Sequence, residues 1–125
     1  MDVSGLSVSI TPSSTSSKIL VLITLGGVAN SGANTESFRV FRGATWIAQP
    51  AVVGGNGAGS FVSWCTTYAP TASFSYLDSP ATTSATTYKV QGSISGGAGT
   101  TYVNRRGADT ASGQSSTIIL MEIKG

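Results

Sequence analysis

The segment Lys18–Leu25, which reads KILVLITL, decides the fold because it carries large apolar side chains at both odd and even positions. Successive side chains of a β-strand point to opposite faces, so the apolar residues of this segment fall into two sets. One set is Ile19, Val21, Ile23 and Leu25, and the other is Leu20 and Leu22. A strand with two apolar faces needs cover on both sides.

The segment Ser116–Lys124, which reads STIILMEIK, repeats this double-sided pattern near the end of the chain. We expect one set of its apolar side chains to enter the core and the other to need a second cover. The predicted core positions are Ile119, Met121 and Ile123. The positions predicted to need the second cover are Ile118 and Leu120.

Elsewhere, apolar residues alternate with serine and threonine in short runs, which is typical of half-buried strands. Further strands are predicted near residues 6–10, 37–41, 45–47, 61–68, 74–76, 86–94 and 101–103. We expect a tight turn near Gly43 and a hairpin through Gly96–Gly99 into the strand at 101–103. The sequence thus predicts one all-β domain over residues 1–125, an antiparallel, jelly-roll-like β-sandwich of about eight strands.

Charge and hydropathy argue against two classes of partner. Seven basic and five acidic residues give a formal net charge of +2, and Arg105 and Arg106 are the one adjacent basic pair. A nucleic-acid groove needs a basic stripe interleaved with aromatic residues, so we predict no nucleic-acid partner. The apolar run Ile19–Ile23 is too short to cross a bilayer, and no signal-peptide pattern follows Met1. We therefore expect cytoplasmic synthesis and no membrane insertion.

The residues available for catalysis are few. The chain has no histidine, and its single cysteine, Cys65, excludes an internal disulfide and a Cys/His catalytic pair. Its five carboxylates are scattered and form no calcium-loop motif, so we predict no metal, no cofactor and no enzymatic activity. A polysaccharide-degrading enzyme stays open as a third hypothesis, because loops could bring Asp78 and Asp109 within the roughly 5 to 10 Å that a glycosidase needs.

The second apolar faces of the two double-sided strands imply an additional covering layer. A neighbouring copy of the chain is one possible cover, and the chain's own glycine-rich loops are the alternative. We favour the neighbouring copy. The predicted subunit-interface residues are Leu20, Leu22, Ile118 and Leu120.

Several segments in order along the chain resemble a known module. They are GLSVSITPSSTSSKILVLI (5–23), FRVFRG (38–43), YLDSPATTSATTYKVQ (76–91), TYVNR (101–105) and STIILMEI (116–123). Together they resemble a β module that recurs in virion surface proteins of tailed phages, especially phages of cyanobacteria and marine bacteria. The resemblance implies a homotrimeric β-sandwich on the virion surface, either in a fibre tip or in a capsid-decorating protein, and it implies no catalytic residue.

The start of the chain bears on the choice between these two places. If the protein begins at Met1, no fibre shaft precedes the module, which favours a decoration (cement) protein that binds the major capsid protein and stabilises the head. The alternative is a tail-fibre tip that binds a host surface glycan. The loops predicted to recognise that glycan contain Asn56, Arg105 and Arg106.

Overall fold

The computed structural model describes residues 1–31, 34–51, 58–65, 68–95, 99–107, 109–110 and 112–125, with the backbone alone at residues 34, 62–65 and 94–95. Within these residues every regular element is a strand, and every strand pair is antiparallel. The predicted all-β antiparallel sandwich is confirmed. The side chain of Cys65 lies outside the described part of the protein.

Among the described residues, ten strands form two main sheets and a small ribbon. The larger sheet has the order β1–β8–β4–β5, with β6 also paired to β4. Its strands are β1 (Asp2–Ile10), β8 (Thr86–Ser95), β4 (Asn34–Arg42), β5 (Thr45–Ile47) and β6 (Phe61–Cys65). The smaller sheet has the order β10–β2–β7, with β10 (Thr117–Ile123), β2 (Lys18–Leu25) and β7 (Ala72–Asp78). The ribbon consists of β3 (Val28–Asn30) and β9 (Thr101–Val103).

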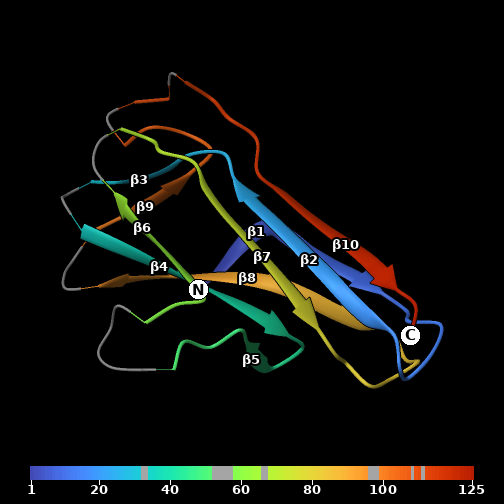
Figure 1. Ribbon diagram of the computed structural model, residues 1–125. Coiled ribbons are helices and arrows are strands. Elements are labelled where there is room, and N and C mark those ends of the chain that lie inside the picture. The colour runs from blue at the N-terminus through green and yellow to red at the C-terminus, as the bar shows by residue number, and fades with distance from the viewer. Residues whose placement is uncertain (32–33, 52–57, 66–67, 96–98, 108, 111) are drawn as a thin grey trace.

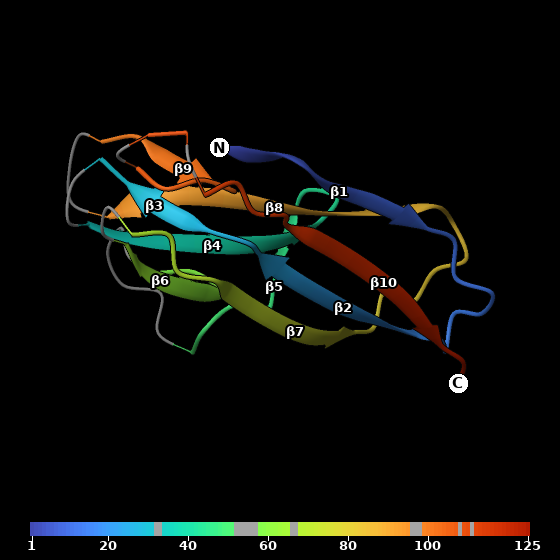
Figure 2. The same ribbon diagram turned by 90° about the horizontal axis from the view of Figure 1, so that it is seen from above.

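The two main sheets stack as layers. In Figure 1 the β10–β2–β7 sheet lies in front of β1, β8 and β4, and Figure 2 shows the same two layers from above. One face of β2 fills the space between the layers, as the alternation in KILVLITL predicts. Its four core residues, each at most 2% exposed, are Ile19, Val21, Ile23 and Leu25.

Aromatic side chains from both sheets complete the core. Phe38 of β4 is fully buried and stacks on Phe61 of β6, with 5.2 Å between the ring centroids. Phe61 in turn stacks on Phe74 of β7 at 5.3 Å. This row of rings joins the larger sheet to the smaller one, so the loss of one ring would weaken the contact between the layers.

Two turn predictions have opposite outcomes. The turn near Gly43 is confirmed, because β4 and β5 pair from Arg42 and Thr45 onward and Gly43 has a φ of +58°, a conformation that glycine adopts without steric cost. The predicted hairpin into residues 101–103 is wrong, because β9 pairs with β3 and not with β8. Both edges of β8 are already occupied, one by β1 and the other by β4.

Candidate functional site

The outer face of the β10–β2–β7 sheet carries large aliphatic side chains that the described residues leave about half exposed. Ile119, Met121, Ile123 and Leu77 are 45–49% exposed. Leu20 and Leu22 of the central strand are half-buried between them, since Met121 and Leu77 flank Leu20 and Ile119 flanks Leu22. We call this set the aliphatic face. Its members are Leu20, Leu22, Leu77, Ile119, Met121 and Ile123.

The aliphatic face corrects the prediction for the last strand. Ile118 and Leu120 were expected on the outer face, but they pair with Ile23 and Val21 and pack against the core. Ile119 and Met121 take the outward positions instead. Residues 118 to 121 are all apolar, so alternation of apolar and polar residues cannot show which of them point inward. The register of β10 with β2 decides this.

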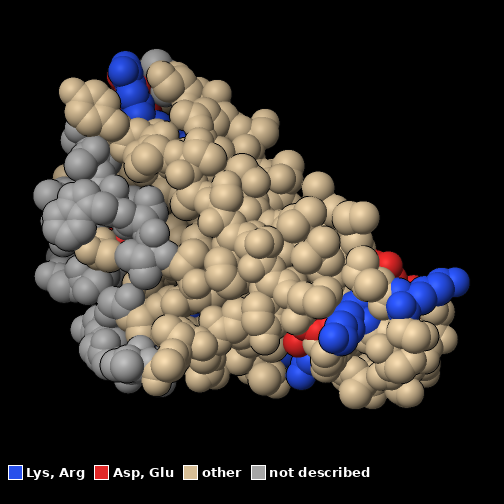
Figure 3. All heavy atoms as spheres, viewed as in Figure 1, with Lys and Arg blue, Asp and Glu red and all other residues tan. Residues whose placement is uncertain are grey.

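The aliphatic face is free of charge along its length and bordered by hydroxyl groups. In Figure 3, which views this sheet from outside, the surface over β7, β2 and β10 is tan, and the charged atoms gather mainly at the two ends of the molecule. Lys18, the cross-strand partner of Ile123, marks one end of the face. Toward the other end the outward residues are Ser73, Ser75, Thr24 and Thr117. In its lack of charge and its large aliphatic side chains, this surface resembles the interior of a protein more than an ordinary solvent-exposed surface.

The one charged side chain of β10 is held away from the aliphatic face. Glu122 alternates to the opposite side from Met121 and Ile123, and its Oε1 accepts hydrogen bonds from the backbone N–H and the hydroxyl of Ser13, both at 2.7 Å. These bonds lower the pKa of the Glu122 carboxyl from its ordinary value. The contact also joins the loop after β1 to β10.

Replacing Glu122 by glutamine is expected to remove an acid-sensitive part of the stability. The pKa of Glu122 is lowered from 4.5 in the folded protein, so its contribution is fully present above pH 4.5 and is lost as the pH falls through the folded pKa. Urea denaturation should show that the unmodified protein is more stable than Glu122→Gln at neutral pH. This difference should shrink as the pH falls below 4.5. A difference that does not change with pH would contradict the assignment.

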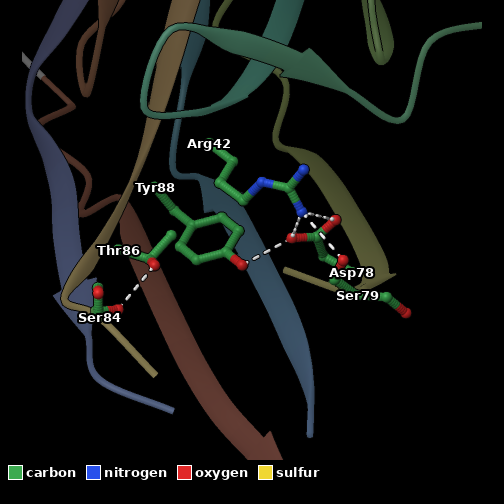
Figure 4. Close-up of polar contacts among 6 residues, drawn as sticks. All are labelled: Arg42, Asp78, Ser79, Ser84, Thr86 and Tyr88. Carbon is green, nitrogen blue, oxygen red and sulfur yellow. Dashed lines mark hydrogen bonds and ion pairs between the residues drawn. The ribbon is translucent and has the colours of Figure 1, made fainter. Parts of the chain in front are cut away.

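A polar cluster inside the sandwich joins the two sheets at the end where β7 stops. Figure 4 shows Asp78 of β7 between Arg42 of β4 and Tyr88 of β8. Arg42 Nη1 donates to both carboxylate oxygens of Asp78, at 3.0 and 2.8 Å, and the Tyr88 hydroxyl donates to Oδ2 at 2.7 Å. Arg42 Nη1 also donates to the carbonyl oxygen of Ser79 at 3.2 Å. Sequence reasoning named Asp78 as a carboxylate of the enzyme hypothesis and missed this cluster.

Hydrogen bonds and burial fix the position of the Asp78 carboxylate. The Asp78 side chain is 7% exposed and Tyr88 is fully buried. Burial, with a further contribution from the hydrogen bond to Asp78, raises the pKa of the Tyr88 hydroxyl far above its ordinary value, so this hydroxyl remains a donor. Both oxygens of Asp78 are therefore engaged by other side chains, which is the arrangement of a structural ion pair.

The second carboxylate named by the enzyme hypothesis is also engaged. Asp109 accepts from Arg106, with Nε to Oδ1 at 2.6 Å and Nη2 to Oδ2 at 2.5 Å. This pair is exposed, since about half of each side chain is open to solvent. Among the described residues no group of three or more His, Cys, Asp or Glu side chains could hold a metal ion.

The predicted recognition residues are only partly placed. Arg105 stacks its guanidinium over the ring of Tyr102 at 4.4 Å, and Arg106 is paired with Asp109. Asn56 lies outside the described residues. The structure thus puts Arg105 over the ring of Tyr102 in β9, and it pairs the adjacent Arg106 with Asp109.

A fully buried carboxylate that sequence reasoning missed ties the β3–β9 ribbon to the larger sheet. Glu36 of β4 accepts a hydrogen bond from Asn30 of β3 and another, at 2.8 Å, from the hydroxyl of Thr101 of β9. The sequence around Glu36 did not predict its burial. Charged residues are rarely buried unless they have partners, and the partners of Glu36 could not be identified from the sequence. Asn30 lies on the strand just before β4, whereas Thr101 lies on a strand far along the chain.

A cavity of about 870 Å³ lies between the first half of β1 and the β3–β9 ribbon. Its apolar wall includes Val3 and Val103, but polar groups on its rim are already bonded within the protein. Thr101 donates to Glu36, and Ser116 donates to Asn104.

The sequence matches no protein-family model and no curated protein. In the part of the chain that the structure describes, no helix is long and apolar enough to span a membrane.

Proposed function

We propose that this protein is a non-enzymatic structural protein on the surface of a tailed-phage virion, where it forms a homotrimer that decorates and stabilises the capsid. The observation that carries the proposal is the aliphatic face of the β10–β2–β7 sheet. A chain that leaves four large aliphatic side chains about half exposed on one sheet is suited to a larger assembly. The resemblance of its segments to phage surface modules supplies the virion context.

The proposed mechanism is burial of apolar surface and not chemistry. Each Å² of apolar surface removed from water contributes about 25 cal/mol, so an interface of ordinary size can outweigh the entropy of association without ion pairs. A trimer bound to the major capsid protein would link neighbouring capsid subunits and oppose the pressure of the packaged DNA. The ordered cores within each copy would transmit that load.

A tail-fibre tip that binds a host surface glycan is the second candidate. The observation in its favour is the cluster of Arg105, Arg106 and Tyr102 at one end of the sandwich, where all three side chains are partly exposed. A guanidinium and an aromatic ring together can hydrogen-bond and stack on a sugar. In this case the same fold would present its end, and not its sheet face, to the ligand.

Imaging of the protein on the virion separates the two candidates. Gold-labelled antibody against this chain, applied to particles of a phage that encodes it, is expected to decorate the head. Label at the tail tip, together with inhibition of adsorption by the free protein, would support the fibre-tip candidate. Particles without label, or particles that keep full head stability after the gene is deleted, would contradict the decoration role.

A further inference from the structure

We propose that the aliphatic face is a contact between copies of this chain, with the outward side chains of β10 and β2 at its centre. The inference rests on the proposed assembly, but it concerns a surface that can be tested in solution without a phage. The residues of this contact are Leu20, Leu22, Leu77, Ile119, Met121 and Ile123. Ile118 and Leu120 are not among them, because they face the core.

The dimensions of the aliphatic face fit the apolar centre of a protein interface. From Ile119 to Ile123 the face runs about 13 Å along β10, and from β10 to β7 it spans about 10 Å across two strand spacings. With the side chains included, it covers on the order of 300 Å², the size of a functional patch on a monomer. A stable interface buries about 800 Å² per partner, so the surrounding serine and threonine side chains would supply its rim.

The composition of the aliphatic face favours a second copy over a foreign protein. Permanent interfaces resemble a domain core cut in half and are most often formed between identical chains, whereas interface hot spots in general are enriched in Trp, Tyr and Arg. The face holds only Leu, Ile and Met, and Glu122 is turned to the other side of β10 by its bonds to Ser13. The faces of three copies can meet around a threefold axis, where their side chains would interdigitate.

A lipid surface fits the face less well. Segments that lie in a membrane interface combine an apolar side with many Lys and Arg side chains and with Trp or Phe. At the aliphatic face one lysine, Lys18, stands at the end of the patch, and the bordering residues Ser73, Ser75, Thr24 and Thr117 are uncharged. A flat β-sheet face of this kind is better matched by another sheet.

Met121→Asp tests the inference, because Met121 lies in the middle of the face and is 49% exposed, so the change should leave the fold intact. In sedimentation analysis the variant is expected to run as a monomer at concentrations where the unmodified protein is an oligomer. Leu20→Asp should do the same. Met121→Gln, which keeps the length of the side chain, is expected to weaken association at least tenfold.

The matched control is Ser7→Asp, an equal change of charge at an exposed position on the outer face of the other sheet. It should keep the oligomer. If Met121→Asp had the same mass in solution as the unmodified oligomer, the inference would be wrong. It would also be wrong if the unmodified protein stayed monomeric and floated with phosphatidylcholine–phosphatidylglycerol vesicles. The two proposals can also fail separately. If the variants dissociate as expected but antibodies do not find the protein on virions, the proposed function is wrong and the contact between copies still holds.

Discussion

Replacement of Asp78 by alanine is expected to lower the free energy of unfolding by about 3 kcal/mol, one of the two largest losses we predict for a single change. The substitution removes the acceptor of the Tyr88 hydroxyl and leaves Arg42 Nη1 with its bond to the carbonyl oxygen of Ser79. Tyr88 is fully buried, so its hydroxyl would lose its partner in a place that water does not reach. The Arg42 side chain is 28% exposed and can turn partly to solvent, which keeps the loss at the lower end of the range for buried pairs.

Urea denaturation followed by intrinsic fluorescence measures this loss. Asp109→Ala is the matched control, because it also breaks an arginine–aspartate pair, but an exposed one, and it should leave the unfolding midpoint nearly unchanged. Asp78→Asn should fall between the two, since the amide oxygen can still accept from Tyr88. Equal midpoints for Asp78→Ala and Asp109→Ala would show that the internal cluster does not hold the two sheets together.

Phe38→Ala is expected to cost about 3 to 5 kcal/mol, because it removes a fully buried ring from the row that joins the sheets. The cavity left behind is bounded by Phe61 on one side, and Phe61 would keep its stacking with Phe74 but lose its stacking with Phe38. Neighbouring side chains can fill only part of this space, because Phe38 lies on a central strand that is paired along both edges. The loss should appear as a lower urea midpoint.

Phe38→Leu separates the loss of the ring from the loss of buried volume. Leucine fills much of the space, so a cost on the order of 1 kcal/mol is expected for this variant. If Phe38→Ala cost no more than Phe38→Leu, the row of rings would not be an organising part of the core.

The sequence predicts which side chains of a strand are buried where the residues of its two faces differ. In β2 the two sets of apolar residues are correctly separated, and the core set is the buried one. In β10 the same reasoning fails, since residues 118 to 121 are all apolar and the pairing with β2 alone decides which of them face inward. A one-residue shift of register would exchange the two faces, and no local pattern reports the register.

The missed polar contacts have a different cause. Arg42, Asp78 and Tyr88 lie on three separate strands, and each is ordinary in its own segment. Their convergence depends on how the two sheets are stacked, which is a property of the whole fold. In the ribbon, the strand at 101–103 was predicted but β3 and its pairing with β9 were missed, because the three residues of β3 are too few to show alternation. Of the residues in the aliphatic face, only Leu20 and Leu22 were predicted to face outward. In β2 the two sets of apolar residues are clear from the sequence.

The mass of the purified, unmodified protein in solution tests the central claim, that copies of this chain cover one another's exposed sheet face. Sedimentation equilibrium over a wide concentration range is expected to give three times the 12.6 kDa mass of one chain. A single species of 12.6 kDa at every concentration would contradict it.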